Sequence, residues 1–270
     1  LDLGTTGVRY ECYDLDGRIL ASGRSSIREQ TVTKWIGSLK SAIPKKKGFE
    51  TSEELILSAQ STSGTVLLVD EYGNEISRPF MYHERAVEEF RKIEALKSLG
   101  DLSNRGVSIS STSPLPKILS IRNKYPRDFE KVRWILSPTT WLLYKLTCPE
   151  GEKWENISTD WTNALKFGVD LTQEYPVWFK PLFDDVDISI DLLPRIVPCG
   201  EKLGTAGSEL AEKLGLRNAG IFHGMTDGNA AALAVGCIGE GDFGFSCGTT
   251  TAVKYVCNEM KPHRAIYYHK

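Results

Sequence analysis

One short stretch near the start of the sequence joins glycine to hydroxyl side chains in a way that suits phosphate binding. Asp2 precedes the turn Gly4, Thr5 and Thr6, and Arg9 adds a positive charge close by. Glycine lets the backbone approach a phosphate closely, where N–H groups and hydroxyls can donate to it. A carboxylate before such a turn is a ligand type that Mg²⁺ takes. The stretch therefore predicts a magnesium-phosphate cradle, with a purely structural strand-turn-strand as the alternative.

The same device occurs again late in the sequence, at Gly248, Thr249 and Thr250. Two such turns can hold one triphosphate between them. Gly-Thr-Thr is also favourable turn chemistry for an ordinary hairpin, so the spacing alone leaves both interpretations open.

Asp227, in the segment HGMTDGNAAALAVG, is the candidate for proton transfer. An aspartate at the start of a helix commonly serves as an N-cap, which stabilises the helix by about 1 kcal/mol. This aspartate also follows a strand pattern and precedes small side chains, which predicts a carboxylate at the floor of a cleft. There it could accept a proton from a substrate hydroxyl, and capping does not prevent that role.

A different chemistry is suggested by the run Asp-Leu-Asp-Gly that starts at Asp14, because it resembles the nucleophile loop of haloacid-dehalogenase-type phosphatases. Such an enzyme needs its aspartate exposed at a strand end, with a small hydroxyl and a distal acidic pair nearby. Arg18 follows the run instead, and a hairpin pattern continues directly beyond it. Asp184 and Asp185 could form the acidic pair, but their segment has the pattern of a solvated loop. The phosphatase is kept as a remote alternative.

The elements that must position these residues alternate between strand and helix patterns. In chain order we expect a hairpin at 7–23, a helix at 31–43, strands at 53–60 and 65–76, mostly helix at 84–147, a helix at 208–215, a strand, turn and helix at 218–236, and a final hairpin at 241–259. Glycines clustered at 236–242 mark the one expected domain boundary.

The composition is that of a globular protein, with 270 residues of which 41% are hydrophobic. Its 33 basic and 35 acidic side chains form no basic stripe, so nucleic acid is not an expected partner. No run approaches the roughly 20 apolar residues of a membrane span, and no signal peptide opens the chain, so we expect a cytoplasmic protein without a membrane partner. The six cysteines lack metal-ligand spacing and are expected to be reduced and mostly buried.

Six segments, taken in this order, resemble the FGGY family of carbohydrate kinases. They are the first phosphate stretch and hairpin at 2–20, the substrate segment at 59–86, the stretches at 136–147 and 158–170, the Asp227 segment at 223–236 and the second phosphate stretch at 245–251. The resemblance implies an α/β protein of the ribonuclease H-like, actin-like ATPase type, with a mixed sheet flanked by helices.

The resemblance also implies a division of the chain. Residues 1–238 would form the sugar-binding, actin-like domain I, and residues 239–270 would begin the nucleotide-binding domain II. Most of this second domain would follow residue 270, so we expect a fragment of a longer kinase that binds a sugar but holds ATP poorly.

The family's site roles can be carried over residue by residue. Asp227 would be the general base and Asp2 the carboxylate associated with Mg²⁺. The phosphates of ATP would face Gly4, Thr5, Thr6, Arg9, Gly248, Thr249 and Thr250. The sugar would contact Thr62 and Ser63, with Glu84, Arg85 and Asp160 as further neighbours.

The implied reaction is transfer of the γ-phosphoryl group of ATP·Mg²⁺ to a ketopentose, with D-ribulose first and D-xylulose or another sugar or polyol as the alternative. His83 with Glu84, Thr140 and Cys148 depart from the commoner family residues, which leaves the sugar open because specificity depends on matched hydroxyl partners. A non-catalytic sugar-binding protein derived from a kinase is the alternative of another class. Dimers are common in the family, so a homodimer also stays open.

Overall fold

The computed structural model describes residues 1–43, 54–247, 251–263 and 266–269, so the predicted phosphate turn Gly248, Thr249 and Thr250 lies outside the described residues. Its strands are β1 (Asp2–Leu3), β2 (Gly7–Tyr13), β3 (Ile19–Ser26), β4 (Ile56–Leu57), β5 (Gln60–Ser61), β6 (Leu67–Val69), β7 (Trp134–Leu136), β8 (Ser158–Asp160), β9 (Val169–Asp170), β10 (Val177–Trp178), β11 (Arg195–Val197), β12 (Lys202–Thr205), β13 (Gly220–Phe222), β14 (Met225–Thr226), β15 (Phe243–Cys247) and β16 (Thr251–Tyr255). Its helices are α1 (Val32–Ala42), α2 (Val87–Ile93), α3 (Lys97–Asn104), α4 (Pro114–Lys124), α5 (Pro126–Phe129), α6 (Pro138–Thr147), α7 (Trp161–Gly168), α8 (Lys180–Asp185), α9 (Glu209–Lys213) and α10 (Asp227–Ala234), with a 3₁₀ turn at Ile190–Leu192.

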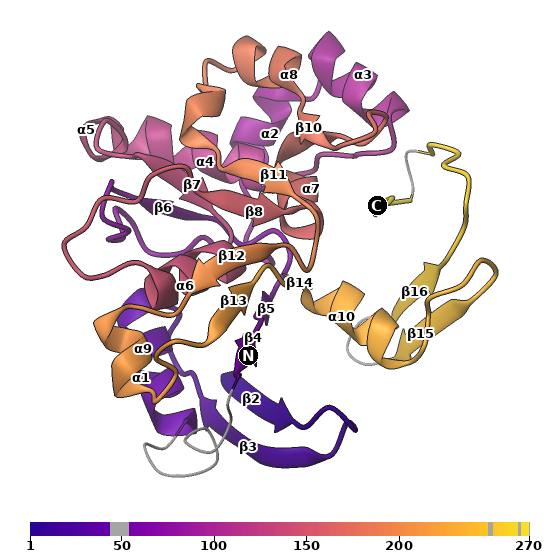
Figure 1. Ribbon diagram of the computed structural model, residues 1–270. Coiled ribbons are helices and arrows are strands. Elements are labelled where there is room, and N and C mark those ends of the chain that lie inside the picture. Colours follow the sequence, from indigo (N-terminus) through magenta and orange to yellow (C-terminus); the bar gives the residue numbers. More distant parts are fainter. Residues whose placement is uncertain (44–53, 248–250, 264–265, 270) are drawn as a thin grey trace.

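The central sheet has five strands in the order β14-β5-β1-β2-β3 (Figure 1). β1, β2 and β3 form an antiparallel meander, whereas β5 pairs in parallel with both β1 and β14. The sheet is therefore mixed, and helices pack beside it, which confirms the predicted α/β class. The predicted first hairpin and the helix at 31–43 are confirmed as β2–β3 and α1.

Two hydrophobic cores hold the chain together, and the paired strands β6 and β7 separate them. Leu67 and Leu136 belong to the first core with α1, α6 and α9, where Trp35 and Trp141 meet edge to face with ring centroids 5.9 Å apart. Leu68 belongs to the second core, with α4, α7 and α8. Successive strand residues point to opposite faces, so this two-stranded ribbon supplies apolar side chains to both cores.

The mostly helical interpretation of 84–147 is confirmed in α2 to α6 but missed β7. Trp134, Ile135 and Leu136 are all buried and pair antiparallel with β6. A strand buried on both faces has a continuous apolar run without alternation, so its pattern cannot be told from that of a buried helical segment.

The run that starts at Asp14 forms the turn of the β2–β3 hairpin. The Asp14 carboxylate accepts the backbone N–H groups of Asp16 at 3.0 Å and Arg18 at 2.8 Å, and Gly17 has φ +81°. Asp14 thus stabilises a turn, as Asx side chains commonly do. Asp185 and its neighbour at 184 end helix α8, so the expectation of a loop there was wrong. Neither feature supports a phosphatase.

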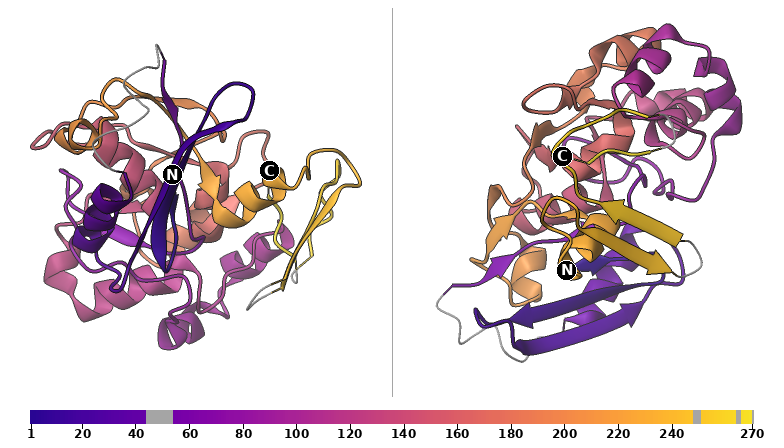
Figure 2. Two further views of the ribbon diagram at one scale, coloured as in Figure 1. Left: turned by 90° about the horizontal axis from the view of Figure 1, so that it is seen from below. Right: turned by 90° about the vertical axis from the view of Figure 1, so that its right-hand side faces the viewer.

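The expectation of mostly buried cysteines was also wrong. Cys237 is buried, while Cys12, Cys148 and Cys199 are partly exposed. Cys247 and Cys257 are exposed because they lie in and just after the β15–β16 hairpin, which projects from the body of the molecule (Figure 2). All six are free thiols.

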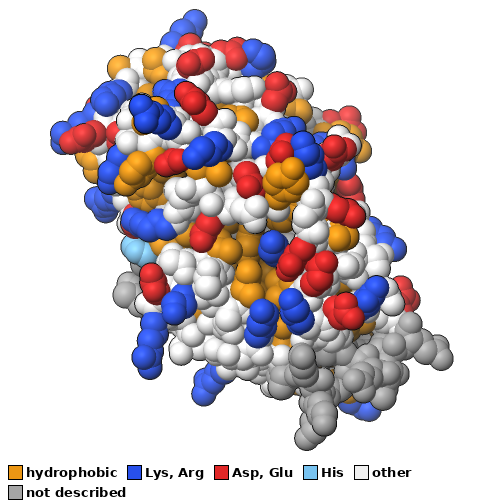
Figure 3. Space-filling model, turned by 90° about the vertical axis from the view of Figure 1, so that its left-hand side faces the viewer, with side chains coloured by type: hydrophobic (Ala, Val, Ile, Leu, Met, Phe, Trp, Pro, Cys, Tyr) orange, Lys and Arg blue, Asp and Glu red, His pale blue; other side chains and the backbone are white. Residues whose placement is uncertain are grey.

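Basic and acidic side chains are interspersed over the described part of the face seen in Figure 3, with hydrophobic side chains exposed between them. Within the described ranges, the helices are too short or too polar for any of them to cross a membrane.

A close backbone approach fixes β14 against β5. A Cβ atom added to Gly224 would lie 1.7 Å from the carbonyl oxygen of Ala59 and 2.8 Å from its carbonyl carbon. Neither atom belongs to a flexible side chain, so only glycine allows the two backbones to pair at this point. Gly224 thereby allows β14, which begins at the next residue, to pair with β5.

We predict that Gly224→Ala lowers the free energy of unfolding by about 3 kcal/mol or more, because the backbone must shift to accept the methyl group. Gly37→Ala is the matched control, since a Cβ there meets no atom within 4 Å on the exposed side of α1. The control should gain up to about 1 kcal/mol from helix propensity. Urea unfolding of the three proteins measures both changes, and equal stability of the two variants would contradict the prediction.

A buried histidine links α6, β8 and the segment between β13 and β14. The Nε2 atom of His223 lies 2.8 Å from the Ser158 hydroxyl, and the Tyr144 hydroxyl accepts the Ser158 backbone N–H at 2.7 Å. The Nδ1 atom of His223 has no hydrogen-bond partner among the described residues. Burial, followed by the nearby Arg195 charge, lowers the pKa of His223 to about 4.

This pKa predicts a stability change in acid. Between pH 6.5 and 4 the unfolded chain protonates this histidine while the folded chain does not, so the free energy of unfolding falls as the pH falls through that window. We expect His223→Gln to flatten the slope of stability against pH there, whereas His83→Gln, at an exposed position, should keep it. Denaturant titrations at several pH values test this, and parallel slopes for wild type and His223→Gln would contradict it.

Candidate functional site

Three of the predicted site segments begin where the parallel strands of the central sheet end. Asp2 and Met225 both pair with Gln60, and one residue further along the strands Leu3 and Thr226 both pair with Ser61. The residues that follow these strands therefore leave the sheet at one edge. Those residues are Gly4, Thr62 and Asp227, so the structure brings together the first phosphate turn, the predicted sugar loop and the predicted base.

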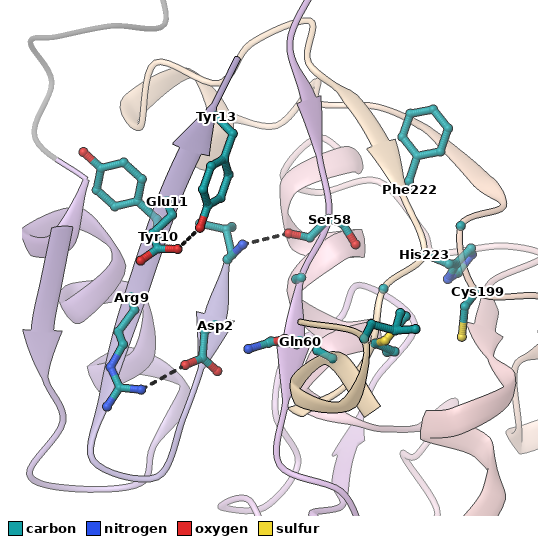
Figure 4. Close-up of a pocket in the computed structure, with 17 residues that line it drawn as sticks. Asp2, Arg9, Tyr10, Glu11, Tyr13, Ser58, Gln60, Cys199, Phe222 and His223 are labelled. Atoms are coloured by element: carbon teal, nitrogen blue, oxygen red, sulfur yellow. Dashed lines mark hydrogen bonds and ion pairs between the residues drawn. The ribbon is translucent and has the colours of Figure 1, made fainter. Parts of the chain in front are cut away.

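The two faces of these strands differ in character. Leu3, Ser61 and Thr226 are buried and face the core. Asp2 and Gln60 point the other way, into a cavity of about 760 Å³ (Figure 4). Asp227 follows β14 as the first residue of α10 and is not among the residues that line this cavity, although its charge interacts with that of Asp2.

Asp2 and Arg9 share one wall of this cavity. The Arg9 guanidinium lies 3.4 Å from the Asp2 carboxylate, and Figure 4 shows the two side chains pointing toward each other from neighbouring strands. The predicted metal ligand and the predicted phosphate-facing cation are thus adjacent. His223 and Cys199 line the opposite wall.

The first phosphate turn is anchored by its backbone. Gly4 N–H donates to the carbonyl of Gly7 at 3.0 Å, and the Thr6 carbonyl accepts the N–H of Ile27 at 2.9 Å. The Gln30 side chain donates to the Thr5 carbonyl. Within the described ranges neither threonine hydroxyl has a hydrogen-bond partner, so both can donate to a ligand.

Asp227 is the first residue of α10, and the N-cap is Thr226. The Asp227 carboxylate accepts the N–H of Gly228 at 2.7 Å, and Asp227 remains accessible to solvent. Partial desolvation by the surrounding protein, with the Asp2 charge as a smaller contribution, raises the pKa of Asp227 above the usual value. Lys166 and Lys254 oppose this rise through their positive charges. A carboxylate with a raised pKa is a stronger base than an ordinary aspartate.

Asp160 anchors β14, the strand that directly precedes Asp227. It is 1% exposed and accepts hydrogen bonds from Thr162 N at 3.0 Å, Thr162 Oγ1 at 2.7 Å and Asn163 N at 2.9 Å. The Thr162 hydroxyl in turn accepts the N–H of Thr226 at 2.9 Å. The predicted sugar neighbour Asp160 is therefore occupied as the N-cap of α7, and two hydrogen bonds through the Thr162 hydroxyl link it to Thr226, the residue before Asp227.

The predicted sugar loop is held by its own hydroxyls. The Thr62 and Thr65 hydroxyls are 2.9 Å apart, and Thr65 also accepts the N–H of Tyr82 at 3.0 Å. Thr62 is buried, whereas Ser63 is partly accessible. Thr65 thus joins this loop to the segment around residue 82.

The other predicted sugar neighbours differ in their contacts and exposure: Glu84 is held in an ion pair, whereas Arg85 is exposed. Glu84 binds the Arg78 guanidinium through both oxygens, at 2.6 and 2.9 Å, and accepts the N–H of Met81 at 2.7 Å. Its hydrogen bonds to Arg78 lower the pKa of Glu84. Arg85 is exposed and lines a separate hollow with Glu88. The structure therefore does not bring Arg85 into the cavity beside Asp2.

Sequence reasoning missed Lys117, which is fully buried on α4. Its ammonium donates to the carbonyls of Gly64 at 2.9 Å and Met81 at 2.7 Å, and lies 5.7 Å from the centre of the Phe80 ring. Burial lowers the pKa of Lys117 to about 8. Lys117 thus joins the sugar loop to the segment that carries Glu84. The only sequence signal was a lysine within the apolar run PLPKILSI.

We predict that Lys117→Met lowers the free energy of unfolding by roughly 2 kcal/mol or more, because two buried carbonyls lose their donor. Lys124→Met changes an exposed lysine on the same helix and should stay within about 0.5 kcal/mol of wild type. Chemical denaturation gives both values. A Lys117→Met protein as stable as the control would mean that the two carbonyls find other donors.

The sequence and the fold both match known proteins. A family model described as the FGGY family of carbohydrate kinases, N-terminal domain, matches residues 1–234. A ribulokinase of Staphylococcus aureus is 26% identical over 212 residues, and a xylulose kinase of Lactococcus lactis is 31% identical over 140 residues. These matches cover 70% and 52% of this chain.

Solved structures of similar fold include a xylulose kinase from Rhodospirillum rubrum, with a TM-score of 0.86 and 18% identity over 98% of this chain. The glycerol kinase of Plasmodium falciparum with ADP has a TM-score of 0.81 and 19% identity over 93% of this chain. The chain covers 56% and 52% of these two proteins, and only 37% of the ribulokinase and 26% of the Lactococcus xylulose kinase.

Proposed function

The chain belongs to the FGGY family of carbohydrate kinases, and from this membership we propose that it is the sugar-binding part of an ATP-dependent kinase for a ketopentose. One observation carries the proposal. The turn Gly4–Thr6, the loop at Thr62 and the carboxylate of Asp227 leave the sheet at a single edge, where parallel strands end. Ligands of open α/β sheets bind outside the carboxyl ends of their strands.

In the proposed reaction Asp227 accepts the proton of a sugar hydroxyl as that oxygen bonds to the γ-phosphorus of ATP, and the bond from this phosphorus to ADP breaks. Asp227 suits this step because it is accessible and its pKa is raised by partial desolvation. Asp160 supports the step indirectly, since its contact with Thr162 fixes the backbone N–H of Thr226.

Asp2 is the residue that would hold Mg²⁺. It is the only predicted metal ligand, and groups of three or more histidine, cysteine, aspartate or glutamate side chains that could hold a metal do not occur among the described residues. This fits Mg²⁺, which is usually bound through one or two carboxylates together with substrate phosphates. When bound, the ion neutralises charge on the phosphates.

D-ribulose is the sugar we propose, with D-xylulose or another polyol as the alternative. The relatives matched by sequence are a ribulokinase and a xylulose kinase, and the sugars in both names, ribulose and xylulose, are ketopentoses. Ser63 is partly accessible beside the buried Thr62, so the loop offers hydroxyl partners to a polyhydroxy substrate.

We further propose that residues 1–238 form the sugar-binding domain and that 239–270 begin a nucleotide-binding domain. Helix α10 ends at Ala234, and Gly236 with φ +79° turns the chain before the β15–β16 hairpin. In the sequence, the predicted second phosphate turn lies between the residues of β15 and those of β16.

The decisive test is Asp227→Asn in the full-length gene product. We expect phosphorylation of ribulose to fall by at least 10²-fold, because the base is removed while the side-chain shape is kept. Sugar binding measured by calorimetry should remain within a few-fold of wild type. Asp14→Asn, in the hairpin turn, is the matched control and should retain full turnover. A coupled ADP-release assay over a panel of ketoses, aldoses and polyols gives both rates and identifies the sugar.

Two outcomes would contradict the proposal. Normal turnover by Asp227→Asn would remove this carboxylate from the mechanism. A wild-type protein that binds a sugar without any nucleotide effect or ADP release would be a non-catalytic sugar-binding protein instead.

A further inference from the structure

The side chain of Asn229 joins the helix that begins at the candidate base to the C-terminal segment, which begins with β15. Asn229 lies in the first turn of α10, two residues after Asp227. Its amide oxygen accepts a hydrogen bond from Nζ of Lys254 on β16 at 2.6 Å, and its amide nitrogen lies 3.0 Å from Nδ1 of His269. These partners follow Asn229 by 25 and 40 residues, and Figure 1 shows the β15–β16 ribbon beside α10. Both polar ends of this one amide are therefore bound by the C-terminal segment.

The ammonium of Lys254 is thereby held beside Asp227. A Cβ atom added to Gly228 would be 4.0 Å from Cε of Lys254, and the Asp227 carboxylate accepts the N–H of this same glycine at 2.7 Å. Within the described ranges no ion pair joins the two side chains, so their charges interact without direct contact. Asn229 thus fixes the cation on the side of α10 where the carboxylate lies.

This position is unfavourable for a cation by itself. The N-terminus of a helix carries the positive end of the helix dipole, which repels a nearby ammonium. Burial, and then the charge of Lys166, lower the pKa of Lys254, whereas the Asp227 charge raises it. The Asp227 carboxylate therefore favours an ammonium at this point, and each of the two groups stabilises the ionised form of the other.

Three charged side chains from three elements act on Asp227. Asp2 comes from β1, Lys166 from α7 and Lys254 from β16. Desolvation raises the pKa of Asp227 most, the Gly228 N–H and the two lysines lower it, and Asp2 raises it further. β1 and α7 contribute side chains to the two cores, whereas the ribbon pairs only with itself in the described sheets. Of these three charges, that of Lys254 therefore depends on how the C-terminal segment lies against α10.

We propose that Asn229 and Lys254 are positioning residues for the transfer reaction: Asn229 holds the Lys254 ammonium where it keeps Asp227 ionised, and so ready to accept a proton, while the C-terminal segment is docked on α10. The inference rests on the proposed function and adds a form of regulation to it. When the segment moves away, the base loses a counter-charge and is protonated more readily. The proposed nucleotide-binding domain begins with this segment, so its docking would prepare the base for the reaction.

The test is the pH dependence of sugar phosphorylation by the full-length protein, in wild type, Lys254→Met, Lys254→Arg and Asn229→Ala. Turnover falls in acid as Asp227 is protonated. A cation stabilises a nearby carboxylate, so removal of the Lys254 charge should raise the pKa of Asp227 and move this acid limb to higher pH, by about half a pH unit or more. Asn229→Ala should move it in the same direction, and Lys254→Arg should keep it near its wild-type position. Lys261→Met changes an exposed lysine later in the same segment and is the matched control, which should leave the limb in place.

Titration of the Asp227 carboxyl by carbon-13 NMR, with the signal identified by its loss in Asp227→Asn, gives a second readout that needs no turnover. Lys254→Met should raise the pKa measured in this way by a similar amount. A wild type that shows this dependence on Lys254 but phosphorylates no sugar would contradict the proposed function alone, so the two failures are distinguishable.

Thermal unfolding of each variant separates the electrostatic effect from misfolding, because a merely structural role lowers stability and turnover without moving the acid limb. An unmoved acid limb in a folded Lys254→Met protein would overturn the inference. A limb that moves in Lys254→Met but not in Asn229→Ala would overturn the role of Asn229. A change confined to the KM for ATP would also overturn the inference and assign Lys254 to the phosphates.

Discussion

The parallel pairing of β1, β5 and β14 is the constraint on which the candidate site depends. Each of these strands is only two residues long, so their mutual backbone hydrogen bonds are few. Hydroxyl groups on the buried face fix the alignment instead. Ser61 meets the Thr139 hydroxyl at 2.7 Å, and Thr226 donates to Thr162 at 2.9 Å. These contacts join the ends of the strands to the starts of α6 and α7. Because α6 packs in the first core and α7 in the second, both cores hold the candidate site in place.

Several charged side chains near the site hold backbone groups in place. Asp160 fixes the start of α7, Lys117 joins two loops, and Glu84 with Arg78 closes the turn at Met81. Asp160 and Lys117 are buried, and a buried charge is tolerated only when its hydrogen bonds are satisfied, so these two groups fix the segments around them. The predicted site carboxylates that remain accessible are Asp2 and Asp227.

Much of this organisation was predictable from the sequence, because it depends on local patterns. Gly17 in a hairpin turn, the apolar spacing of α1 and the strand, turn and helix around Asp227 each follow from short-range chemistry. What failed depended on distant partners. β7 is a strand because β6 covers one edge and two cores cover its faces, and the burial of Lys117 is set by carbonyls 36 and 53 residues away in the chain. Such distant partners cannot be predicted from residue spacing. Glu84 and Asp160 were therefore predicted as sugar neighbours from a resemblance alone, and only the fold shows their structural contacts.

The hairpin β15–β16 pairs only with itself in the described sheets. Two-stranded ribbons are marginally stable in water, so this ribbon can open while both cores stay intact. Lys254 on β16 donates a hydrogen bond to the side chain of Asn229, in the first turn of α10. The surroundings of Asp227 are consequently unequal in stability. On one side it adjoins strands and helices that are packed into the two cores, and on the other it adjoins a ribbon that contributes to neither core.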